Sequence, residues 1–322
     1  MKNILMMKGA RTLVDACTRI KEGEKVLIVT DTEKVGIAEV VAAAANERGG
    51  EVTMAIMVPR KTDGEEPPHP VAEAMKKYDV IFIPVMKSIT HTQAVKNAAA
   101  AGARILVMTH FSEETLISGG IDCDFEAQKP ICQGVARILE QGKRLHLTTQ
   151  RGTHLRANIE GRRGNSLYCI VEPGQFSTVP TIEANVSPIE GSAEGVIVAD
   201  ASVPYLGIGV LREPVTLQVK NGMITSIEGG SQAQILAENL KSFGTPNVYN
   251  VAEVGIGLNP KSRMIGVMLE DEGVFGSVHI GIGSNLTLGG NLKTACHYDV
   301  LMWRGTIEID GRLILENGQL RI

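Results

Sequence analysis

Apolar residues in the first part of the chain form short continuous runs, and alanine-rich segments separate these runs. A continuous apolar run is typical of a strand that is buried on both faces of a parallel sheet. We predict four such strands, at residues 25–31, 51–57, 80–85 and 104–109, and intervening helices at residues 9–20, 32–48 and 92–101, with a shorter one ending near Lys77. Strands that alternate with helices indicate βαβ units. The sequence therefore predicts an α/β N-terminal domain with an open, mainly parallel sheet.

The pattern changes to strict alternation of apolar and polar residues from Arg144 onward. Residues 144–149 and 155–159 alternate as half-buried antiparallel strands do. Hairpin dipeptides follow at Asn221-Gly222, Asp310-Gly311 and Asn317-Gly318, and one helix is expected at residues 231–242. We therefore predict two domains: an α/β three-layer domain at residues 1–142, and a β-rich α+β metal-binding, catalytic domain at residues 143–322.

Composition narrows the class of protein. With 322 residues, 43% hydrophobic and 21% charged, the chain has enough apolar residues for two globular cores. A net charge of −4 argues against non-specific nucleic-acid binding, which needs a basic surface. No apolar run reaches the roughly 20 residues of a membrane helix. We expect a cytoplasmic protein that binds a small molecule or short peptide, with no membrane or nucleic-acid partner.

Polar residues follow the third and fourth predicted strands, where an open parallel sheet usually binds its ligands. They are Ser88 to Thr92, which include His91, and Thr109-His110. His91 and His110 are therefore candidates to orient a substrate. The alternative is that Thr90 caps a helix and that His91 lies in the first turn of this helix without a functional role.

The segment from Glu253 to Asp299 mixes ionisable residues with apolar strands. Glu253 and His279 each lie in a glycine-rich apolar strand, where an unpaired charge is costly to bury. In His297-Tyr298-Asp299 the outer residues are two apart, so on a strand both side chains project to the same face. Imidazole and carboxylate are common ligands of divalent ions, which indicates a metal site.

Two other kinds of site do not match the sequence. Gly255-x-Gly257 and Gly281-x-Gly283 supply only half of a dinucleotide-binding fingerprint and lie among strands. The G-x-S-x-G motif of a serine nucleophile is absent. The five cysteines show no CxxC spacing, and we expect them to be buried free thiols.

Residues 253–299, together with residues 180–184 and 188–195, resemble the thermophilic metallo-aminopeptidases, the leucyl aminopeptidases of the aminopeptidase T and aminopeptidase S type. The resemblance implies one or two divalent ions (Zn, Co or Mn), a homodimer, and metal-activated water that cleaves an amide or peptide bond. The implied ligands are Glu183, Glu253, His279, His297 and Asp299.

The resemblance also implies roles for further residues. Glu272 is the candidate general base, because the acidic run at residues 270–272 resembles an acidic pair in those peptidases; a solvated turn is the alternative reading. His154 and Arg156 join His91 and His110 as candidate substrate-binding residues. One departure is Leu286, which replaces a family tyrosine that is thought to assist the transition state.

The 2,5-dihydroxypyridine dioxygenases share the fold of those peptidases, and residues 88–92 resemble their first-domain loop. They are mononuclear non-haem Fe(II) enzymes, use a histidine where this chain has Glu253, and lack the carboxylate at Glu183. The dioxygenases are therefore expected to hold iron in a 2-His-1-carboxylate site, whereas this chain has carboxylates at Glu183 and Glu253. This difference favours an aminopeptidase-like metallo-hydrolase, with a ring-cleaving dioxygenase as the alternative. A non-catalytic binding protein with a structural metal is a third hypothesis, which the oxygen-rich ligand set disfavours.

Overall fold

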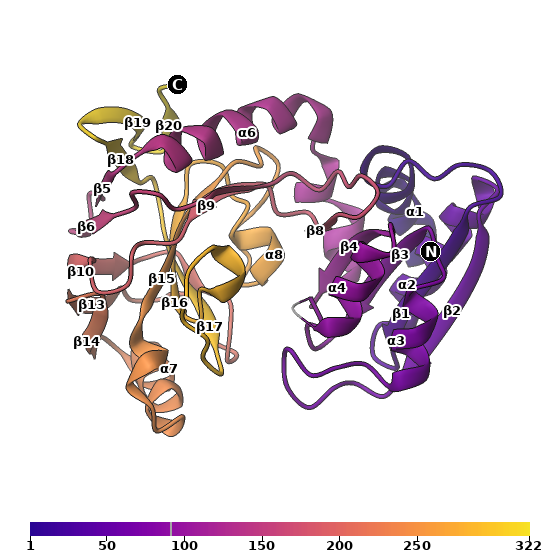
Figure 1. The fold of residues 1–322 in the computed structure, drawn as a ribbon, viewed down its shortest axis with the longest axis horizontal. Coiled ribbons are helices and arrows are strands. Elements are labelled where there is room, and N and C mark those ends of the chain that lie inside the picture. Colours follow the sequence, from indigo (N-terminus) through magenta and orange to yellow (C-terminus); the bar gives the residue numbers. More distant parts are fainter. Residues whose placement is uncertain (91) are drawn as a thin grey trace. The chain divides into compact units, whose positions relative to one another are not determined.

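The computed structural model describes residues 1–90 and 92–322, so the predicted residue His91 lies outside the described part. The chain divides into two compact units (Figure 1). Unit 1 contains Met1–Lys129 and Tyr168–Pro180, and unit 2 contains Pro130–Leu167 and Thr181–Ile322. Each unit is thus made of two chain segments, and the first crossing between the units lies within helix α6 (Phe125–Gln141).

Unit 1 is built around a parallel sheet with the strand order β2-β1-β3-β4-β8. Its strands are β1 (Lys25–Asp31), β2 (Glu51–Met57), β3 (Val80–Val85), β4 (Arg104–Thr109) and β8 (Phe176–Thr178). Its helices are α1 (Lys2–Thr12), a π-helical turn (Leu13–Cys17), α2 (Val35–Glu47), α3 (His69–Met75), α4 (Gln93–Ala100), α5 (Glu113–Ile117) and a 3₁₀ turn (Gly120–Asp122). The first four strands have the bounds that their apolar runs predict.

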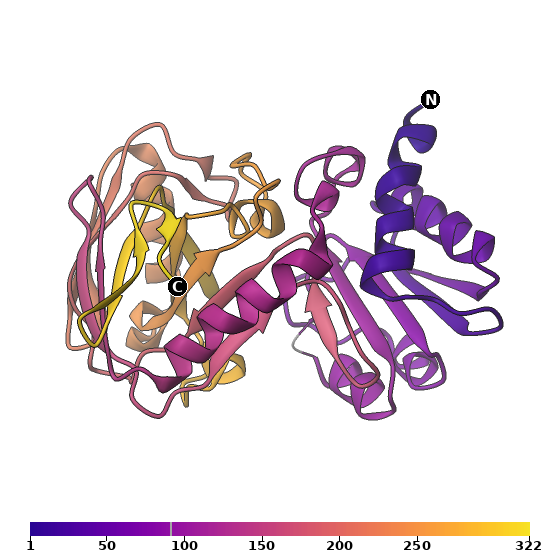
Figure 2. The same cartoon turned by 90° about the horizontal axis from the view of Figure 1, so that it is seen from above.

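Strand β8 is the part of this sheet that the sequence pattern does not reveal. It pairs in parallel with β4 and has only three residues, which is too short for a periodic signal (Figure 2). Strand β8 belongs to the segment Tyr168–Pro180, which returns the chain to unit 1 after residues 130–167 of unit 2. The parallel sheet that the sequence predicts is confirmed, with one more strand than expected.

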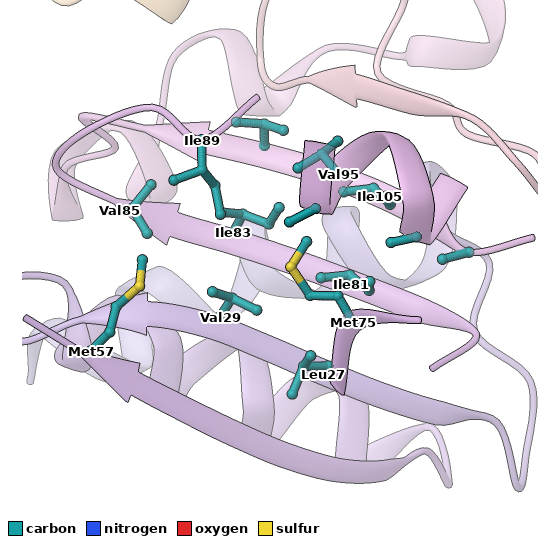
Figure 3. Packing of buried hydrophobic residues seen from close by; sticks show 14 residues of the cluster. Leu27, Val29, Met57, Met75, Ile81, Ile83, Val85, Ile89, Val95 and Ile105 are labelled. Atoms are coloured by element: carbon teal, nitrogen blue, oxygen red, sulfur yellow. The ribbon is translucent and has the colours of Figure 1, made fainter. Parts of the chain in front are cut away.

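One apolar core of unit 1 lies between the sheet and helices α3 and α4 (Figure 3). Leu27 and Val29 of β1 face this core together with Ile81 and Ile83 of β3, as the alternation of side chains along a strand requires. Met75 of α3 packs against them and is fully buried. Helix α2 covers the opposite face of the sheet, where it contacts β1 and β2, and it also packs against α1.

Helix α1 begins earlier than the sequence predicts, at Lys2 rather than at Gly9. Gly9 lies inside this helix, and a Cβ there would be 2.0 Å from the carbonyl oxygen of Leu116 in α5. The glycine therefore permits close helix packing and does not mark a helix end. Helix α2 begins later than the predicted residue 32, since Lys34 occupies its N-cap position.

Unit 2 contains antiparallel sheets of eight, five and two strands. The eight-stranded sheet has the order β14-β13-β10-β6-β5-β18-β19-β20, with β5 (Arg144–Thr148), β6 (His154–Asn158), β10 (Glu194–Ala199), β13 (Val215–Lys220), β14 (Met223–Glu228), β18 (Thr306–Ile309), β19 (Arg312–Glu316) and β20 (Gln319–Leu320). The small hairpin pairs β11 (Ser202–Val203) with β12 (Gly209–Val210). The helices are α7 (Ser231–Ser242), α8 (Met268–Asp271) and 3₁₀ turns at Pro246–Tyr249 and Leu286–Leu288.

The five-stranded sheet has the order β17-β16-β15-β9-β7. Its strands are β7 (Gly164–Leu167), β9 (Glu183–Val186), β15 (Val251–Gly257), β16 (Val278–Gly283) and β17 (His297–Met302). Three of them, β9, β15 and β16, are buried along their whole length. The β-rich unit that the alternating pattern predicts is thus present. Among the described residues, no helix is long and apolar enough to span a membrane.

Candidate metal centre

The candidate ligands lie on one face of the five-stranded sheet. Glu253 of β15 pairs with Gly281 of β16, and Gly281 pairs in turn with Asp299 of β17. His279 of β16 pairs with Gly255 of β15. The two remaining pairs are His297 with Gly283 and Glu183 with Gly257. Paired residues project to the same face of a sheet. Each candidate ligand therefore lies beside a glycine of a neighbouring strand on that face.

These glycines make room for the ligand side chains. A Cβ on Gly255 would lie 1.9 Å from His279 Nε2. A Cβ on Gly281 would lie 2.6 Å from His297 Cε1 and 2.7 Å from Glu253 Cβ. Any larger residue at either position would occupy the space in which the imidazoles and carboxylates meet.

Glu183, Glu253 and His279 form one group that could hold a metal ion. His279 Nε2 lies 3.3 Å from Glu183 Oε2 and 3.6 Å from Glu253 Oε1. All three side chains are buried. Their facing atoms lie within 4.8 Å of one another, so a single ion can contact all of them.

A second group contains Glu253, His297 and Asp299. His297 Nε2 lies 3.0 Å from Glu253 Oε2 and 3.4 Å from Asp299 Oδ1. Glu253 belongs to both groups and turns one oxygen toward each imidazole. Within residues 1–90 and 92–322, these two groups are the ones that bring three potential ligands together.

Neighbouring groups orient three of the five side chains and leave one atom of each for an ion. The hydrogen bonds run from Asn185 Nδ2 to Glu183 Oε1 (2.9 Å), from the Tyr205 hydroxyl to Asp299 Oδ2 (2.7 Å), and from His297 Nδ1 to the Ser284 carbonyl (2.7 Å). Such outer contacts are the usual way in which proteins fix metal ligands.

The atoms left over fit a divalent cation. Glu183 Oε2 and Asp299 Oδ1 are buried, and neither has a hydrogen-bond partner among the described residues. Each lies beside an imidazole Nε2, where a shared cation would satisfy both atoms. Each group offers one imidazole and two carboxylates, an oxygen-rich set that suits a divalent ion with open positions. Neither group by itself is a 2-His-1-carboxylate triad.

The pKa values of the five side chains show how their charges depend on one another. Burial raises the pKa of Glu183 to about 7, although the nearby His279 lowers it. Burial opposes protonation of His279, but Glu183 and Glu253 outweigh this effect and raise its pKa to about 9. Asp299 and Glu253 likewise raise the pKa of His297 despite its burial. The imidazoles in turn lower the pKa of Glu253 and Asp299, against the effect of burial.

Glu272 borders this cluster. It follows α8, its exposed fraction is 8%, and its Oε1 lies 3.1 Å from the Tyr205 hydroxyl. Burial and the charges of Asp299 and Glu183 raise the pKa of Glu272 well above its ordinary value. Its environment therefore favours the protonated carboxyl, whereas the general base expected from the sequence would have to be ionised.

The other predicted residues do not belong to the two groups. His110 follows β4 in unit 1, is half-buried, and has a φ of 55°. His154 and Arg156 lie on β6 of the eight-stranded sheet and are exposed, and the ring centroid of His154 is 4.8 Å from that of His146. Leu286, at the position of the missing family tyrosine, is 49% exposed.

Sequence reasoning missed Asn185, Tyr205 and Ser284. Asn185 could have been found, because it is two residues from Glu183 on the same strand, the spacing that relates His297 to Asp299. Ser284 contributes a backbone carbonyl, which no side-chain pattern reveals. Tyr205 is 94 residues from Asp299 in the sequence and lies in a short irregular turn.

The fold thus combines a parallel α/β unit with a β-rich unit that contains a buried imidazole–carboxylate cluster able to hold a metal ion. The chain belongs to the 2,5-dihydroxypyridine 5,6-dioxygenase family (NicX), whose model matches residues 6–322. A 2,5-dihydroxypyridine 5,6-dioxygenase from Pseudomonas putida is 29% identical over 194 residues, which cover 57% of this chain and 55% of that relative. The match thus spans about half the length of the curated relative.

Two solved structures share the fold. The 2,5-dihydroxypyridine dioxygenase of Pseudomonas putida KT2440 has a TM-score of 0.84 and 21% identity, and covers 99% of this chain and 97% of its own. Wild-type AmpT from Thermus thermophilus has a TM-score of 0.71 and 16% identity, and covers 99% of both chains. Both families that the sequence resembles are therefore found again.

The comparisons correct the predicted function. The sequence favoured an aminopeptidase-like metallo-hydrolase, and this prediction is wrong, because the family that matches nearly the whole chain is that of the dioxygenases. The error has a chemical cause, because the prediction ranked the two families by the type of their metal ligands. Carboxylates and imidazoles hold hydrolytic ions and iron alike, so the ligand set does not decide between the two reactions.

Proposed function

We propose that this chain is a metal-dependent dioxygenase that cleaves the ring of a small hydroxylated pyridine. One observation carries the proposal: a buried imidazole–carboxylate cluster with unsatisfied carboxylate oxygens lies in a chain that matches the dioxygenase family over residues 6–322. Such a cluster is costly to bury unless a cation completes it. A hydroxylated pyridine is the substrate in the name of the Pseudomonas putida relative.

Glu253, His297 and Asp299 would hold the iron. Two of them project from the same strand two residues apart, and Glu253 joins them from β15. When bound, iron supplies the reaction with O₂ that amino-acid side chains cannot perform. The protein's own contribution is to fix the three donor atoms and to exclude water from the two carboxylates, since Glu253 and Asp299 are at most 4% exposed, whereas the His297 side chain is 29% exposed.

Glu272 would hold a proton next to the substrate. Burial and the charges of Asp299 and Glu183 raise the pKa of Glu272 well above its ordinary value, which favours the protonated carboxyl. A protonated carboxyl can donate a hydrogen bond to a hydroxyl or ring nitrogen and can pass on its proton when the ring changes charge. Glu272→Gln should therefore lower kcat while leaving the metal content unchanged.

The number of ions is a separate part of the proposal. Glu183 and His279 share Glu253 with the iron group, so the cluster offers a place for a second divalent ion. Metal titration of the apoprotein distinguishes the two cases: we expect saturation at two equivalents of Co²⁺. Saturation at one equivalent would assign Glu183 and His279 to the surroundings of a single ion.

The proposed activity is tested with protein that has been reconstituted anaerobically with Fe²⁺. We expect equimolar consumption of O₂ and 2,5-dihydroxypyridine, measured with an oxygen electrode and by the loss of ring absorbance. Iron-loaded protein that leaves O₂ and a panel of hydroxylated pyridines unchanged would contradict the proposal.

A pair of histidine variants provides the control. His297→Ala should lose iron and activity but keep the circular dichroism spectrum of the fold. His146→Ala, on β5 of the eight-stranded sheet, should keep both iron and activity. Retention of iron by His297→Ala at the wild-type level would remove His297 from the ligand set.

A further inference from the structure

The hydroxyl of Tyr205 joins two carboxylates from different parts of unit 2. It donates to Asp299 Oδ2 at 2.7 Å and lies 3.1 Å from Glu272 Oε1. A phenol has one hydrogen, and the shorter contact assigns it to Asp299. Asp299 is 3% exposed, so this charge-assisted hydrogen bond is shielded from water.

The backbone around Tyr205 is fixed to the elements that carry both carboxylates. Tyr205 lies in the turn of the β11–β12 hairpin. Just before this hairpin, the Ala201 amide donates to the carbonyl of Leu301 in β17 at 3.1 Å. On the other side, a Cβ on Gly266 would be 3.1 Å from the Cα of Gly209, so the hairpin packs tightly against the loop before α8. The position of the hydroxyl is therefore set by β17 and by this loop.

The carboxylate of Asp299 has two oxygens, and the Tyr205 hydroxyl donates a hydrogen bond to one of them, Oδ2. The terminal torsion of an aspartate is broad and two-fold, so an unrestrained carboxylate would sample many orientations. With Oδ2 held by Tyr205, Oδ1 lies 3.4 Å from His297 Nε2, within the second metal-binding group.

From this geometry we propose that Tyr205 is a positioning residue of the metal centre, which holds Asp299 so that only Oδ1 is offered to the ion. The inference rests on the metal site of the proposed function but not on the reaction with O₂. It gives Tyr205 no contact with the substrate. Loss of the hydroxyl should free the Asp299 carboxylate to rotate or to bind the ion through both oxygens.

The test compares Tyr205→Phe with Tyr298→Phe in the full chain. The Tyr298 hydroxyl donates to Asn239 of α7 at 3.0 Å, and its ring centroid is 5.2 Å from that of Tyr205, so it is a matched control beside the same ligands. Apoprotein is titrated with Co²⁺ by calorimetry, and the visible absorption of the bound ion is recorded. The absorption reports coordination number and geometry, which a loss of packing alone would not change.

We expect Tyr205→Phe to bind Co²⁺ about 10- to 100-fold more weakly, as is usual when a partner of a metal ligand is removed. Its cobalt spectrum should also change, whereas Tyr298→Phe should match the wild type in both measurements. 4-Aminophenylalanine at position 205 keeps a donor at the same place and should restore the affinity.

Each outcome bears on a different part of the argument. Equal affinity and equal spectra for wild type and Tyr205→Phe would overturn the positioning role while leaving the proposed function intact. Failure of 4-aminophenylalanine to restore binding would overturn it as well, even if Tyr205→Phe proved too unstable to measure. Wild-type protein that binds no Co²⁺ would contradict the metal site itself and this inference with it.

Discussion

The imidazoles and carboxylates of the metal-free cluster stabilise each other's charged forms. The neighbouring carboxylates raise the pKa of His279 to about 9 and that of His297 well above 6.5, against the effect of burial, which favours the cationic form of both imidazoles. Glu253 and Asp299 have lowered pKa values and are anionic. The two protons on the imidazoles thus take the place that a divalent cation would occupy.

Metal binding should therefore release protons. A histidine must be neutral and a carboxyl ionised to bind a metal, so Co²⁺ binding at pH 7 should displace about two to three protons. One would come from each of His279 and His297, and a fraction of one from Glu183, whose pKa is about 7. Calorimetric titration in buffers of different ionisation enthalpy measures this number. The apparent affinity should rise with pH up to about 9, because fewer protons then compete.

Two results would contradict this account of the cluster. A binding enthalpy that does not depend on the buffer would mean that the imidazoles are already neutral. In His297→Ala, metal that binds through the group of Glu183 and His279 and releases as many protons as in the wild type would mean that His297 had no proton to release.

At the residue scale, the sequence predicts the members of the cluster but not the reason for its glycines. Glu253 and His279 stand out because each is an ionisable residue in an apolar strand, and the resemblance to a known family adds Glu183. From the sequence, the glycines indicate only that these strands are glycine-rich. Their role in the structure is to leave space for the ligand side chains, and this follows from strand register, which a single sequence does not specify.

At the element scale, this use of glycine makes Gly281 a sensitive position of the sheet, because a Cβ there would meet ligands from two neighbouring strands. In Gly281→Ala the new methyl group would overlap the ring of His297 and the stem of Glu253. The side chains must then move apart, so we expect a loss of Co²⁺ affinity of at least about 100-fold and a destabilisation of about 1–3 kcal/mol. Gly36→Ala is the control, because a Cβ at this exposed position in α2 meets nothing within 4 Å. Unchanged cobalt binding in Gly281→Ala would show that the ligands do not converge at this point.

The loop between β16 and β17 is tied to the sheet by Glu190. Its Oε1 accepts hydrogen bonds from the Asn291 amide (2.8 Å) and from Asn285 Nδ2 (2.8 Å), and its Oε2 pairs with the buried Arg162. Burial opposes ionisation of Glu190, but these contacts outweigh it and lower the pKa to about 2. The same loop contains Ser284, whose carbonyl orients the His297 ring.

Glu190→Gln should destabilise the protein by about 1–2 kcal/mol at pH 7, because a charged acceptor of several hydrogen bonds is lost. The pKa of Glu190 is lower in the folded than in the unfolded chain, so its contribution is complete above pH 4.5 and is lost as the pH falls toward 2. Urea unfolding at several pH values should therefore show a gap between wild type and variant that closes below pH 4.5. Glu160→Gln, at an exposed ion pair with Lys143, should show almost no gap at any pH.

Regular elements were predictable wherever the chain is locally periodic. The strands at residues 25–31, 80–85 and 104–109 are confirmed because each is apolar on both faces. What local periodicity cannot give is a pairing between distant segments. β8 joins the parallel sheet from residue 176, after the chain has already entered unit 2, and only the packed structure reveals this.

At the scale of the whole molecule, the chain crosses between its two units several times, but the candidate metal centre belongs to unit 2 alone. All five potential ligands come from β9, β15, β16 and β17. An ion that binds only the folded site stabilises it by mass action, by about 2.7 kcal/mol at 100 times the dissociation constant. Whether unit 1 shares this stabilisation depends on whether the units unfold independently.

Hydrogen exchange with and without Co²⁺ measures this directly. We expect slower exchange at the amides of β9, β15, β16 and β17, because opening of this sheet releases the ion. The amides of β1, β3 and β4 should exchange at an unchanged rate, since unit 1 has its own core between the sheet and helices α3 and α4. Equal slowing in both sheets would mean that the interrupted chain path makes the two units one cooperative body. The same experiment on His297→Ala should show no slowing in β17, which separates the effect of the bound ion from that of added salt.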